Sequence, residues 1–220
     1  MIITIDGPAG SGKSTAARNL AGALGIACLD TGATYRAVTL LALRSEIDLA
    51  DETALAELAR TMDLDMNLTP HGLQVLLDGD DISLDIRSEA VSEASHLAAR
   101  SPVVRGVLVD LQRRIGGSLG SFVAEGRDQG TVVFPDADTK FFLTASPDVR
   151  ARRRVEQLAA QGETAEVDQV RQRIIDRDRR DSTRSIAPLK PADDAIHLCT
   201  DGQTPDETLA TLLSHVKADA

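Results

Sequence analysis

The chain has 220 residues, of which 42% are hydrophobic and 26% charged, and its formal net charge is −10. This length is enough for one sizeable core with small appendages. Aromatic residues make up only 2% of the chain, which together with the acidic balance argues against a polynucleotide-binding protein. Of the cations, 20 are Arg and only 4 are Lys. Because arginine presents a planar fork of donors, this excess indicates recognition of carboxylates or phosphates.

Two further features bear on the cellular compartment. No apolar run approaches the length of a membrane span, and the N-terminal sequence MIITIDG has no basic region ahead of a hydrophobic one. Cys28 and Cys199 lack the spacing of metal ligands, and we expect both to be reduced, buried packing residues. The sequence therefore predicts a cytoplasmic protein with no membrane association.

The N-terminal part predicts strands alternating with helices. Ile2–Ile5 is a β-branched run that favours a buried strand, and it ends at the turn residues Asp6-Gly7-Pro8. From Lys13 to Leu24 the apolar residues recur at helical spacing. The same criteria predict a strand at 26–29, a helix from Asp30-Thr31-Gly32 to about Leu43, and a helix capped by Asp51 that reaches about Met62.

Between residues 63 and 85 the pattern changes to short alternating runs. These runs are separated by the turn sequences Thr69-Pro70-His71-Gly72 and Asp78-Gly79-Asp80. We expect a small antiparallel insert of about three strands here.

The C-terminal half returns to alternating strands and helices. Ser101-Pro102 predicts the start of a helix and Gly116-Gly117 its end. Strands are predicted at 122–124, 140–143 and 195–198, and helices beginning at Ser146-Pro147-Asp148, Thr164 and Thr204-Pro205. Such alternation predicts an α/β fold with a parallel sheet covered on both faces.

The most specific motif is a glycine-rich loop between the first strand and the first helix. It fits the phosphate-binding pattern G-x-x-x-x-G-K-[ST], in which backbone N–H groups and the helix dipole surround an anion. Lys13 would reach the β- and γ-phosphates, and Ser14 would bind Mg²⁺. The residues expected to bind ATP here are Gly7, Pro8, Ala9, Gly10, Ser11, Gly12, Lys13, Ser14 and Thr15.

A second cationic feature lies between Arg150 and Arg184. This segment holds ten arginines against seven acidic residues, in two predicted helices joined by Gln161-Gly162-Glu163. Such a pair resembles a lid that closes over phosphates, excludes water and brings cations to the transferred group. The alternative for individual arginines is a pair of solvated, salt-bridged helices.

Together, these features resemble those of the bacterial cytidylate kinases, which belong to the nucleoside monophosphate kinases. The resemblance runs from the first strand to about Leu198, and three segments carry it: 30–36 (DTGATYR), 125–135 (EGRDQGTVVFP) and 177–184 (RDRRDSTR). Thr31 and Glu125 depart mildly, because Ser and Asp are common at these positions, but each keeps its functional group.

The resemblance implies a three-layer kinase fold with a glycine-rich phosphate loop, carried by one unit of 220 residues. Its expected parts are a core of 1–30, 101–150 and 185–220, a monophosphate-binding part at 31–100 that includes the insert at 63–85, and a lid at 151–184. We expect a monomer, since nothing in the sequence demands a partner chain.

The resemblance also implies which residues read the base of CMP or dCMP. Asp128 matches the carboxylate that accepts from the exocyclic amino group of cytosine. Ser95 and Arg105 match the other base contacts. Uracil would place a carbonyl oxygen against Asp128, and sites that leave buried polar groups unpaired discriminate strongly.

The phosphate and sugar contacts are implied in the same way. Arg36, Arg127 and Arg177 match the arginines that hold the acceptor phosphate, with Thr31 and Tyr35 nearby. Asp181 and Arg184 match residues that hold the sugar, Arg153 and Arg154 are expected on the phosphates of ATP, and Glu125 is expected to hold Mg²⁺ through water. The expected catalytic set is Lys13, Arg127, Arg177 and Arg184.

No general base is required, because the attacking phosphate oxygen is already ionised near neutral pH. Two alternatives stay open at this point. One is a kinase for another small acceptor with a different base-reading set, and the other is a nucleotide switch in which ATP only orders a segment.

Overall fold

The computed structural model describes residues 1–69, 72–160 and 162–216. Pro70, His71 and Gln161, which the sequence places in turns, lie outside the described residues. The elements are, in chain order, β1 (Ile2–Asp6), α1 (Lys13–Leu24), β2 (Ala27–Asp30), α2 (Thr31–Arg44), α3 (Glu52–Thr61), β3 (Leu64–Thr69), β4 (Gly72–Leu77), β5 (Asp80–Asp81), the short turn η1 (Asp85–Arg87), α4 (Glu89–Arg100), α5 (Pro102–Leu119), β6 (Phe122–Gly126), the π-helical turn η2 (Gln129–Val133), β7 (Thr139–Thr144), α6 (Pro147–Ala160), α7 (Val167–Thr183), β8 (Ile196–Cys199) and α8 (Pro205–His215).

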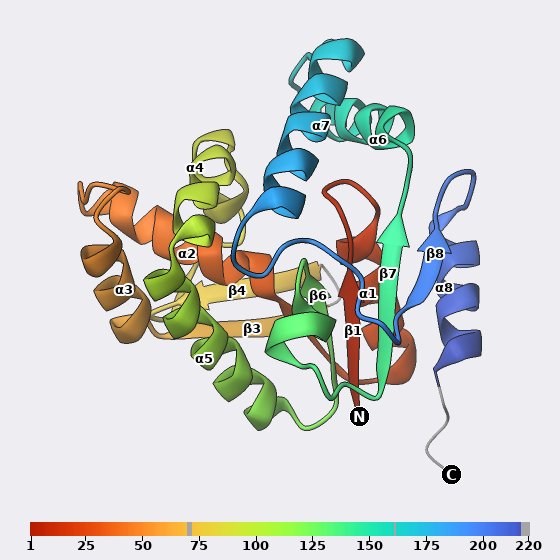
Figure 1. Cartoon of the computed structure of the whole chain (residues 1–220), viewed down its shortest axis with the longest axis horizontal. Coiled ribbons are helices and arrows are strands. Elements are labelled where there is room, and N and C mark those ends of the chain that lie inside the picture. Colours follow the sequence, from red (N-terminus) through yellow and green to blue (C-terminus); the bar gives the residue numbers. More distant parts are fainter. Residues whose placement is uncertain (70–71, 161, 217–220) are drawn as a thin grey trace. The chain divides into compact units, whose positions relative to one another are not determined.

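The strands form two sheets, which confirms the predicted α/β class (Figure 1). The larger sheet has five strands in the order β2-β6-β1-β7-β8, and the smaller has three in the order β3-β4-β5. β1 runs parallel to β7, and β7 runs parallel to β8. Parallel neighbours require crossover connections, and helices supply them here.

The chain divides into two compact units. The first consists of Met1 and residues 21–124, and the second of residues 2–20 and 125–220. The finer division into core, monophosphate-binding part and lid stays a prediction.

The first unit contains helices α2 to α5 and the small sheet. In β4, Leu73, Val75 and Leu77 are buried and alternate with half-buried neighbours, so the strand covers an apolar layer with one face. β3 pairs antiparallel with β4 over its whole length, and β5 adds two residues. The predicted three-stranded insert is therefore confirmed, with a shorter third strand than expected.

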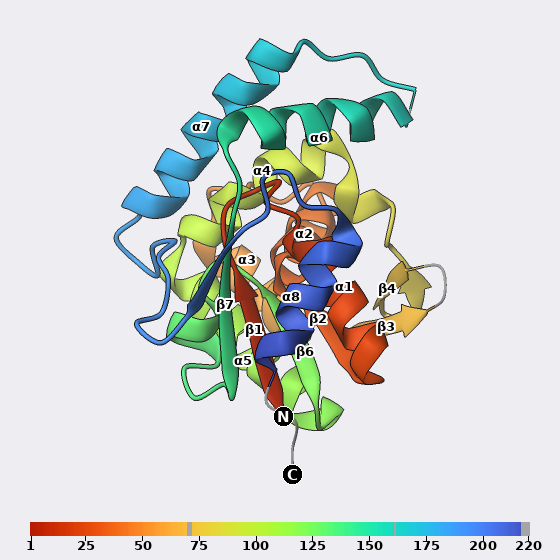
Figure 2. The same cartoon turned by 90° about the vertical axis from the view of Figure 1, so that its right-hand side faces the viewer.

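The second unit carries the strands β1, β7 and β8 and the arginine-rich helices. α6 and α7 lie against each other, as both views show (Figures 1 and 2). Their shared apolar cluster is small and consists of Ala151, Val170 and Ile174, with Val155 and Ala165 at its margin. Because this cluster is small relative to the polar surface of the two helices, their association depends on ion pairs as well as on burial.

Three local expectations are wrong. The first concerns α5, which does not stop at Gly116-Gly117 but continues to Leu119 and ends at Gly120, whose φ of 71° is the left-handed conformation that stops a helix. Gly116 is buried, so packing there outweighs its low helix propensity.

The other two concern Thr164 and Cys199. Thr164 caps no helix, because α7 begins at Val167 and Glu166 occupies the N-cap position. Cys199 is exposed, unlike the buried Cys28, because it lies with His197 on the exposed face of the edge strand β8.

The helix α4 lies in a region to which the sequence assigned no element. Within the described part of the chain, none of the helices is both long and apolar enough to cross a bilayer.

Candidate active site

The glycine-rich loop leaves β1 and enters α1, as the motif requires. Gly7 has a φ of 149°, and a Cβ placed on it would lie 2.0 Å from the Leu143 carbonyl oxygen, so only glycine fits. The Ser11 hydroxyl is fully buried and donates to the Pro8 carbonyl oxygen at 3.0 Å, and the Ser11 N–H donates to the same oxygen. The loop is thereby held in a closed curve before any ligand binds.

The Lys13 ammonium group lies inside this curve. It is 5% exposed, and its Nζ donates to the Pro8 carbonyl oxygen at 2.7 Å. Burial and the positive charges of Arg127 and Arg177 together lower the pKa of Lys13 to about 7, against the opposing effect of Glu125 and Asp6. Three cations therefore act on one another at the loop, which is the electrostatic setting that a polyphosphate would stabilise.

The Ser14 hydroxyl donates to Glu125 Oε1 at 2.5 Å. Glu125 is buried at the end of β6. A hydroxyl and a carboxylate side by side are hard oxygen ligands, so these two residues fit Mg²⁺. Among the residues that the structure describes, no group of three or more His, Cys, Asp or Glu side chains is arranged to hold a metal ion.

The segment after β6 carries two of the predicted acceptor-site residues. Arg127 is 20% exposed; its Nε donates to Asp181 Oδ2 at 3.2 Å and its Nη1 to the Gly126 carbonyl oxygen at 3.2 Å. Asp128 is 4% exposed and precedes η2. The structure thus brings Arg127 together with Asp181 of α7, 54 residues later in the chain.

The arginines of the predicted lid have different surroundings. Arg153 lies against the glycine loop, because a Cβ on Gly12 would be 3.8 Å from its Nη1, and it donates to Thr200 Oγ1 at 3.0 Å and to the Thr200 carbonyl oxygen at 2.8 Å. Arg154 instead donates to Gln157 on its own helix at 2.9 Å. Arg177 is exposed on α7, yet its charge acts on Lys13.

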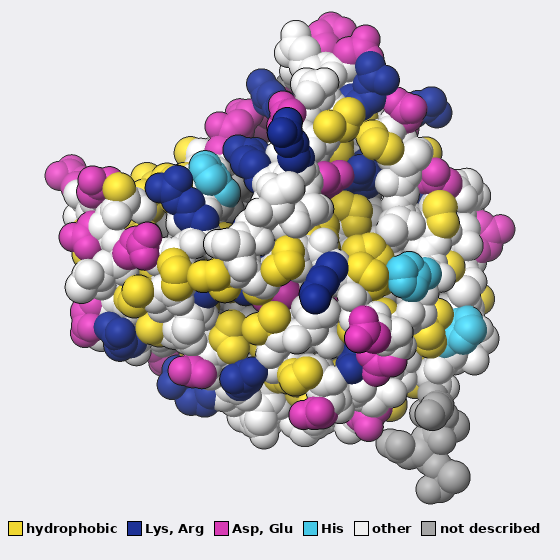
Figure 3. Space-filling model, viewed as in Figure 1, with side chains coloured by type: hydrophobic (Ala, Val, Ile, Leu, Met, Phe, Trp, Pro, Cys, Tyr) yellow, Lys and Arg dark blue, Asp and Glu magenta, His cyan; other side chains and the backbone are white. Residues whose placement is uncertain are grey.

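Arg184 follows α7 and donates through Nε to the Ala187 carbonyl oxygen. Thr15 is exposed at the start of α1. Over the pair α6 and α7, basic and acidic side chains are interspersed on the visible face, at the top of Figure 3.

The first unit holds the remaining predicted acceptor residues. Thr31 is buried at the start of α2, and Asp30 caps this helix by accepting from the Ala33 N–H at 3.0 Å. The other Asp30 oxygen pairs with Arg36 Nη2 at 2.7 Å. The Arg36 Nε is buried and has no hydrogen-bond partner among the described residues. A buried cationic donor of this kind favours an anionic ligand.

Tyr35 and Arg105 also meet in this unit. The Arg105 guanidinium carbon lies 5.6 Å from the centre of the Tyr35 ring, within cation–π range, and Arg105 is 4% exposed on α5. Ser95 is 8% exposed on α4, and its hydroxyl donates to the Ser92 carbonyl oxygen at 3.0 Å.

Two charged side chains of the second unit were not identified from the sequence. Asp6 is buried at the end of β1, and Arg150 is buried at the start of α6, where its Nη1 lies 3.1 Å from the Ala9 carbonyl oxygen of the glycine loop. The signals that could have revealed them were a lone acid ending an otherwise uncharged strand and an arginine within the first turn of the lid.

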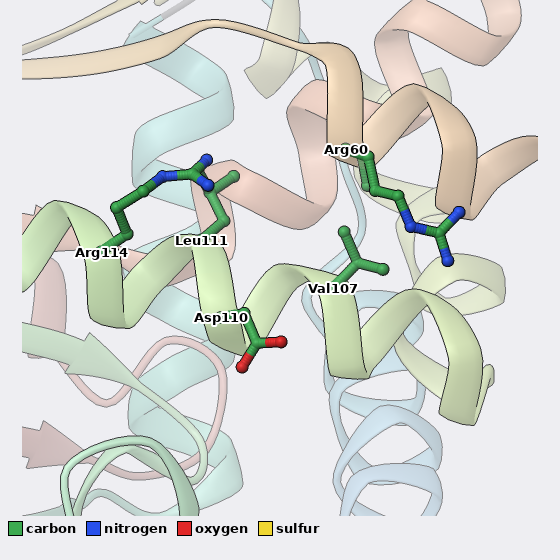
Figure 4. Close-up of a pocket in the computed structure, with 6 residues that line it drawn as sticks. Arg60, Val107, Asp110, Leu111 and Arg114 are labelled. Carbon is green, nitrogen blue, oxygen red and sulfur yellow. The ribbon is translucent and has the colours of Figure 1, made fainter.

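A separate hollow of about 230 Å³ lies between α3 and α5 (Figure 4). Arg60 of α3 faces it, together with Val107, Asp110, Leu111 and Arg114 of α5. None of the predicted site residues lines this hollow, so it is not part of the candidate active site.

Known proteins resemble the chain along its whole length. The family model described as cytidylate kinase matches residues 3–218. A cytidylate kinase of Pelotomaculum thermopropionicum is 48% identical over 217 residues, covering 98% of this chain and 96% of that protein. A cytidylate kinase of Mycobacterium leprae is 46% identical over 217 residues, covering 99% of this chain and 96% of that protein. Among solved structures, an uncharacterized protein from Eubacterium ventriosum aligns with a TM-score of 0.50 and 13% identity over 98% of this chain and 97% of that chain, which is a likeness of fold alone.

Proposed function

Because the chain belongs to the cytidylate kinase family, and is therefore a nucleoside monophosphate kinase, we propose that it transfers the γ-phosphoryl group of ATP to CMP or dCMP. The products are ADP and the corresponding diphosphate. Membership in a family of phosphotransferases sets aside the alternative of a nucleotide switch. The observation that best supports the proposal is the buried Lys13 in the glycine loop, crowded by the charges of Arg127 and Arg177.

The donor side of the reaction rests on the glycine loop. Backbone N–H groups and the start of α1 bind the phosphates of ATP, and Lys13 regains a full positive charge when the phosphate charge arrives. Arg153, beside Gly12, is the lid arginine that we assign to the donor phosphates. The assignment of Arg154 and Thr15 to ATP has less support. Arg154 donates to Gln157 on its own helix, and Thr15 is exposed at the start of α1.

Ser14 and Glu125 are the residues that would hold Mg²⁺, Glu125 through water. When bound, this ion neutralises negative charge on the β- and γ-phosphate oxygens. The Ser14 hydroxyl, which donates to Glu125 without the ion, would turn its lone pairs toward it.

The acceptor side rests on arginines. We assign Arg36, Arg127 and Arg177 to the phosphate of CMP, with Thr31 donating its hydroxyl. Forked guanidinium groups fix an acceptor oxygen in line with the γ-phosphorus, and such positioning accounts for several kcal/mol of a barrier. No proton needs to be removed from the acceptor, because the attacking oxygen is ionised.

Base and sugar are assigned to other residues. Asp128 accepts from the exocyclic amino group of cytosine, and Ser95 and Arg105 donate to the ring acceptors, with Tyr35 stacked beside Arg105. Asp181 and Arg184 bind the sugar hydroxyls. In the structure Asp181 accepts from Arg127, so CMP binding would exchange this contact for contacts to the nucleotide. All these residues come from one chain, and we propose that the enzyme acts as a monomer.

A coupled assay of ADP release tests the proposal. With Mg²⁺ and ATP, we expect turnover with CMP and dCMP at a kcat/KM at least about 100-fold above that for UMP, AMP and dTMP. If turnover is fastest with another monophosphate, CMP and dCMP are not the preferred acceptors, and the alternative of a kinase for a different acceptor is favoured.

A further inference from the structure

Asp6 is a buried carboxylate outside the residue set assigned above. It is the last residue of β1 and is 4% exposed. Each of its oxygens accepts one backbone N–H: Oδ1 from Gln129 at 2.9 Å and Oδ2 from Gly130 at 2.8 Å. A strand that runs into the glycine loop is thereby tied to the segment that follows Arg127 and Asp128.

The tied segment sits tightly on the strands beneath it. A Cβ on Gly130 would lie 2.9 Å from Thr4 Oγ1 and 3.2 Å from Lys140 Cδ, so any side chain there would push the backbone away from β1 and β7. Gly130 therefore permits the close approach that the two Asp6 hydrogen bonds require. The turn η2 then holds Asp128 from the other side, because the N–H groups of Val132 and Val133 donate to its carbonyl oxygen at 2.9 Å and 3.2 Å.

This arrangement has an energetic cost. Burial raises the pKa of Asp6 to about 6 despite the two N–H donors, and the nearby negative charge of Asp128 adds to the increase. A buried charge beside a like charge destabilises the folded state. A carboxylate supplies an acceptor oxygen for each of the two N–H groups, whereas an asparagine in its place would supply only one.

We propose that Asp6 is a positioning residue for acceptor specificity: by holding the backbone of Gln129 and Gly130, it fixes Arg127 and Asp128 for the monophosphate. This inference rests on the proposed function, because it assigns Asp128 to the base and Arg127 to the phosphate. In this proposal Asp6 acts only through the backbone of Gln129 and Gly130. Replacing one of its oxygens leaves a buried N–H without an acceptor and loosens the segment.

The test compares Asp6→Asn with Asp138→Asn. Asp138 is the matched control, because its Oδ2 also accepts a backbone N–H from another segment, that of Ile2 at 2.7 Å, but it holds no predicted site residue. In the Asp6→Asn variant we expect kcat/KM for CMP to fall about 10- to 100-fold, as for other supporting residues of active sites. The ratio of kcat/KM for CMP over UMP should fall about tenfold or more, since Asp128 no longer faces the base at a fixed position.

The other readouts separate positioning from a general loss of structure. The ratio of kcat/KM for CMP over UMP is the deciding readout, because the charge of Asp6 also acts on Lys13 and its loss affects ATP binding as well. Asp138→Asn should keep the wild-type ratio of CMP over UMP within about twofold. Amide hydrogen exchange gives an independent measurement without substrate. In the wild type, the Gln129 and Gly130 amides should be strongly protected, and Asp6→Asn should lose this protection.

Two results would overturn the proposal. One is a folded Asp6→Asn variant that keeps the wild-type ratio of CMP over UMP, whether its overall activity is normal or reduced. The other is unprotected exchange of Gln129 and Gly130 in the wild type, which decides the matter even if the variant does not fold. Failure of the wild type to phosphorylate CMP would instead contradict the proposed function.

Discussion

The guanidinium group of Arg150 lies 2.6 Å from the carboxylate of Asp178, so a buried cation joins α6 to α7. The same side chain donates to the Ala145 carbonyl oxygen at 2.8 Å and to the Ala9 carbonyl oxygen at 3.1 Å. Arg150 therefore links both arginine-rich helices to the glycine loop. We infer that Arg150 positions α6 and α7 rather than binding a nucleotide, since it already contacts three protein acceptors.

Removal of the Asp178 carboxylate should destabilise the protein. In Asp178→Ala, the Arg150 guanidinium stays buried with two carbonyl acceptors but loses its counter-charge, which costs about 1–3 kcal/mol of unfolding free energy. Asp148→Ala is the control, because the ion pair of Asp148 with Arg171 is exposed and 3.4 Å long. Its loss should cost less than about 0.5 kcal/mol. Urea denaturation measures both, and equal effects would show that the Arg150 pair is not special.

Arg127→Ala should remove activity and leave the fold intact. The side chain is partly exposed and fills no core volume, so we expect only a small change in Tm. The loss of a cation from the reacting phosphates should lower kcat/KM for CMP about 100- to 1000-fold. Arg44→Ala, which breaks a half-exposed ion pair with Asp85, is the matched control and should keep normal kinetics. Normal turnover in Arg127→Ala would contradict its assigned role.

Asp128→Ala should change selectivity more than rate. Without the carboxylate, cytosine loses the acceptor for its amino group and uracil loses its repulsion, so the ratio of kcat/KM for CMP over UMP should fall at least about tenfold. Asp136→Ala, at an exposed position, serves as the control. Steady-state kinetics with both nucleotides decides this, and an unchanged ratio in Asp128→Ala would refute the base-reading role.

Lys13 should make stability depend on pH. Its pKa is about 7 in the folded protein and 10.5 in the unfolded chain, so between these values the unfolded chain holds the extra proton. The free energy of unfolding contributed by Lys13 therefore rises as pH rises from 7 to 10.5. Lys13→Met should be inactive yet more stable than the wild type at pH 7.

The stability advantage of Lys13→Met should shrink as pH approaches 10.5. Urea denaturation of both proteins at pH 7, 8.5 and 9.5 measures this difference. A difference that stays constant over this range, or a variant less stable than the wild type at pH 7, would contradict the buried, destabilising position of Lys13.

Local sequence signals predicted most of the elements for physical reasons. The β-branched run of β1, the apolar spacing of α1 and the Thr204-Pro205 start of α8 act over a few residues and appear directly in the sequence. The predicted end of α5 was wrong because Gly116 is buried. Tertiary packing stabilises the helix there, and a local sequence pattern does not contain this information. No strong start signal marks α4, because the side chain of its N-cap Ser88 accepts no hydrogen bond from the first turn and instead donates to the Asp85 carbonyl oxygen at 2.8 Å.

The candidate site was predictable only where a motif spans it. The glycine loop is contiguous, so its residues were predicted as a set. Arg153 and Thr200 are 47 residues apart, and Asp6 and Gly130 are 124 apart, so neither contact follows from spacing. The roles of Ser95 and Arg105 came from resemblance to a family, since a buried Ser or Arg on a helix carries no local mark.

Calorimetric titration of the wild-type protein with CMP, and in parallel with cytidine, tests the central claim that the acceptor is held through its phosphate by arginines. We expect CMP to bind and cytidine, which lacks the phosphate, to bind at least about 100-fold more weakly. Equal affinities for CMP and cytidine, or no binding of CMP to a protein that binds ATP, would contradict the claim.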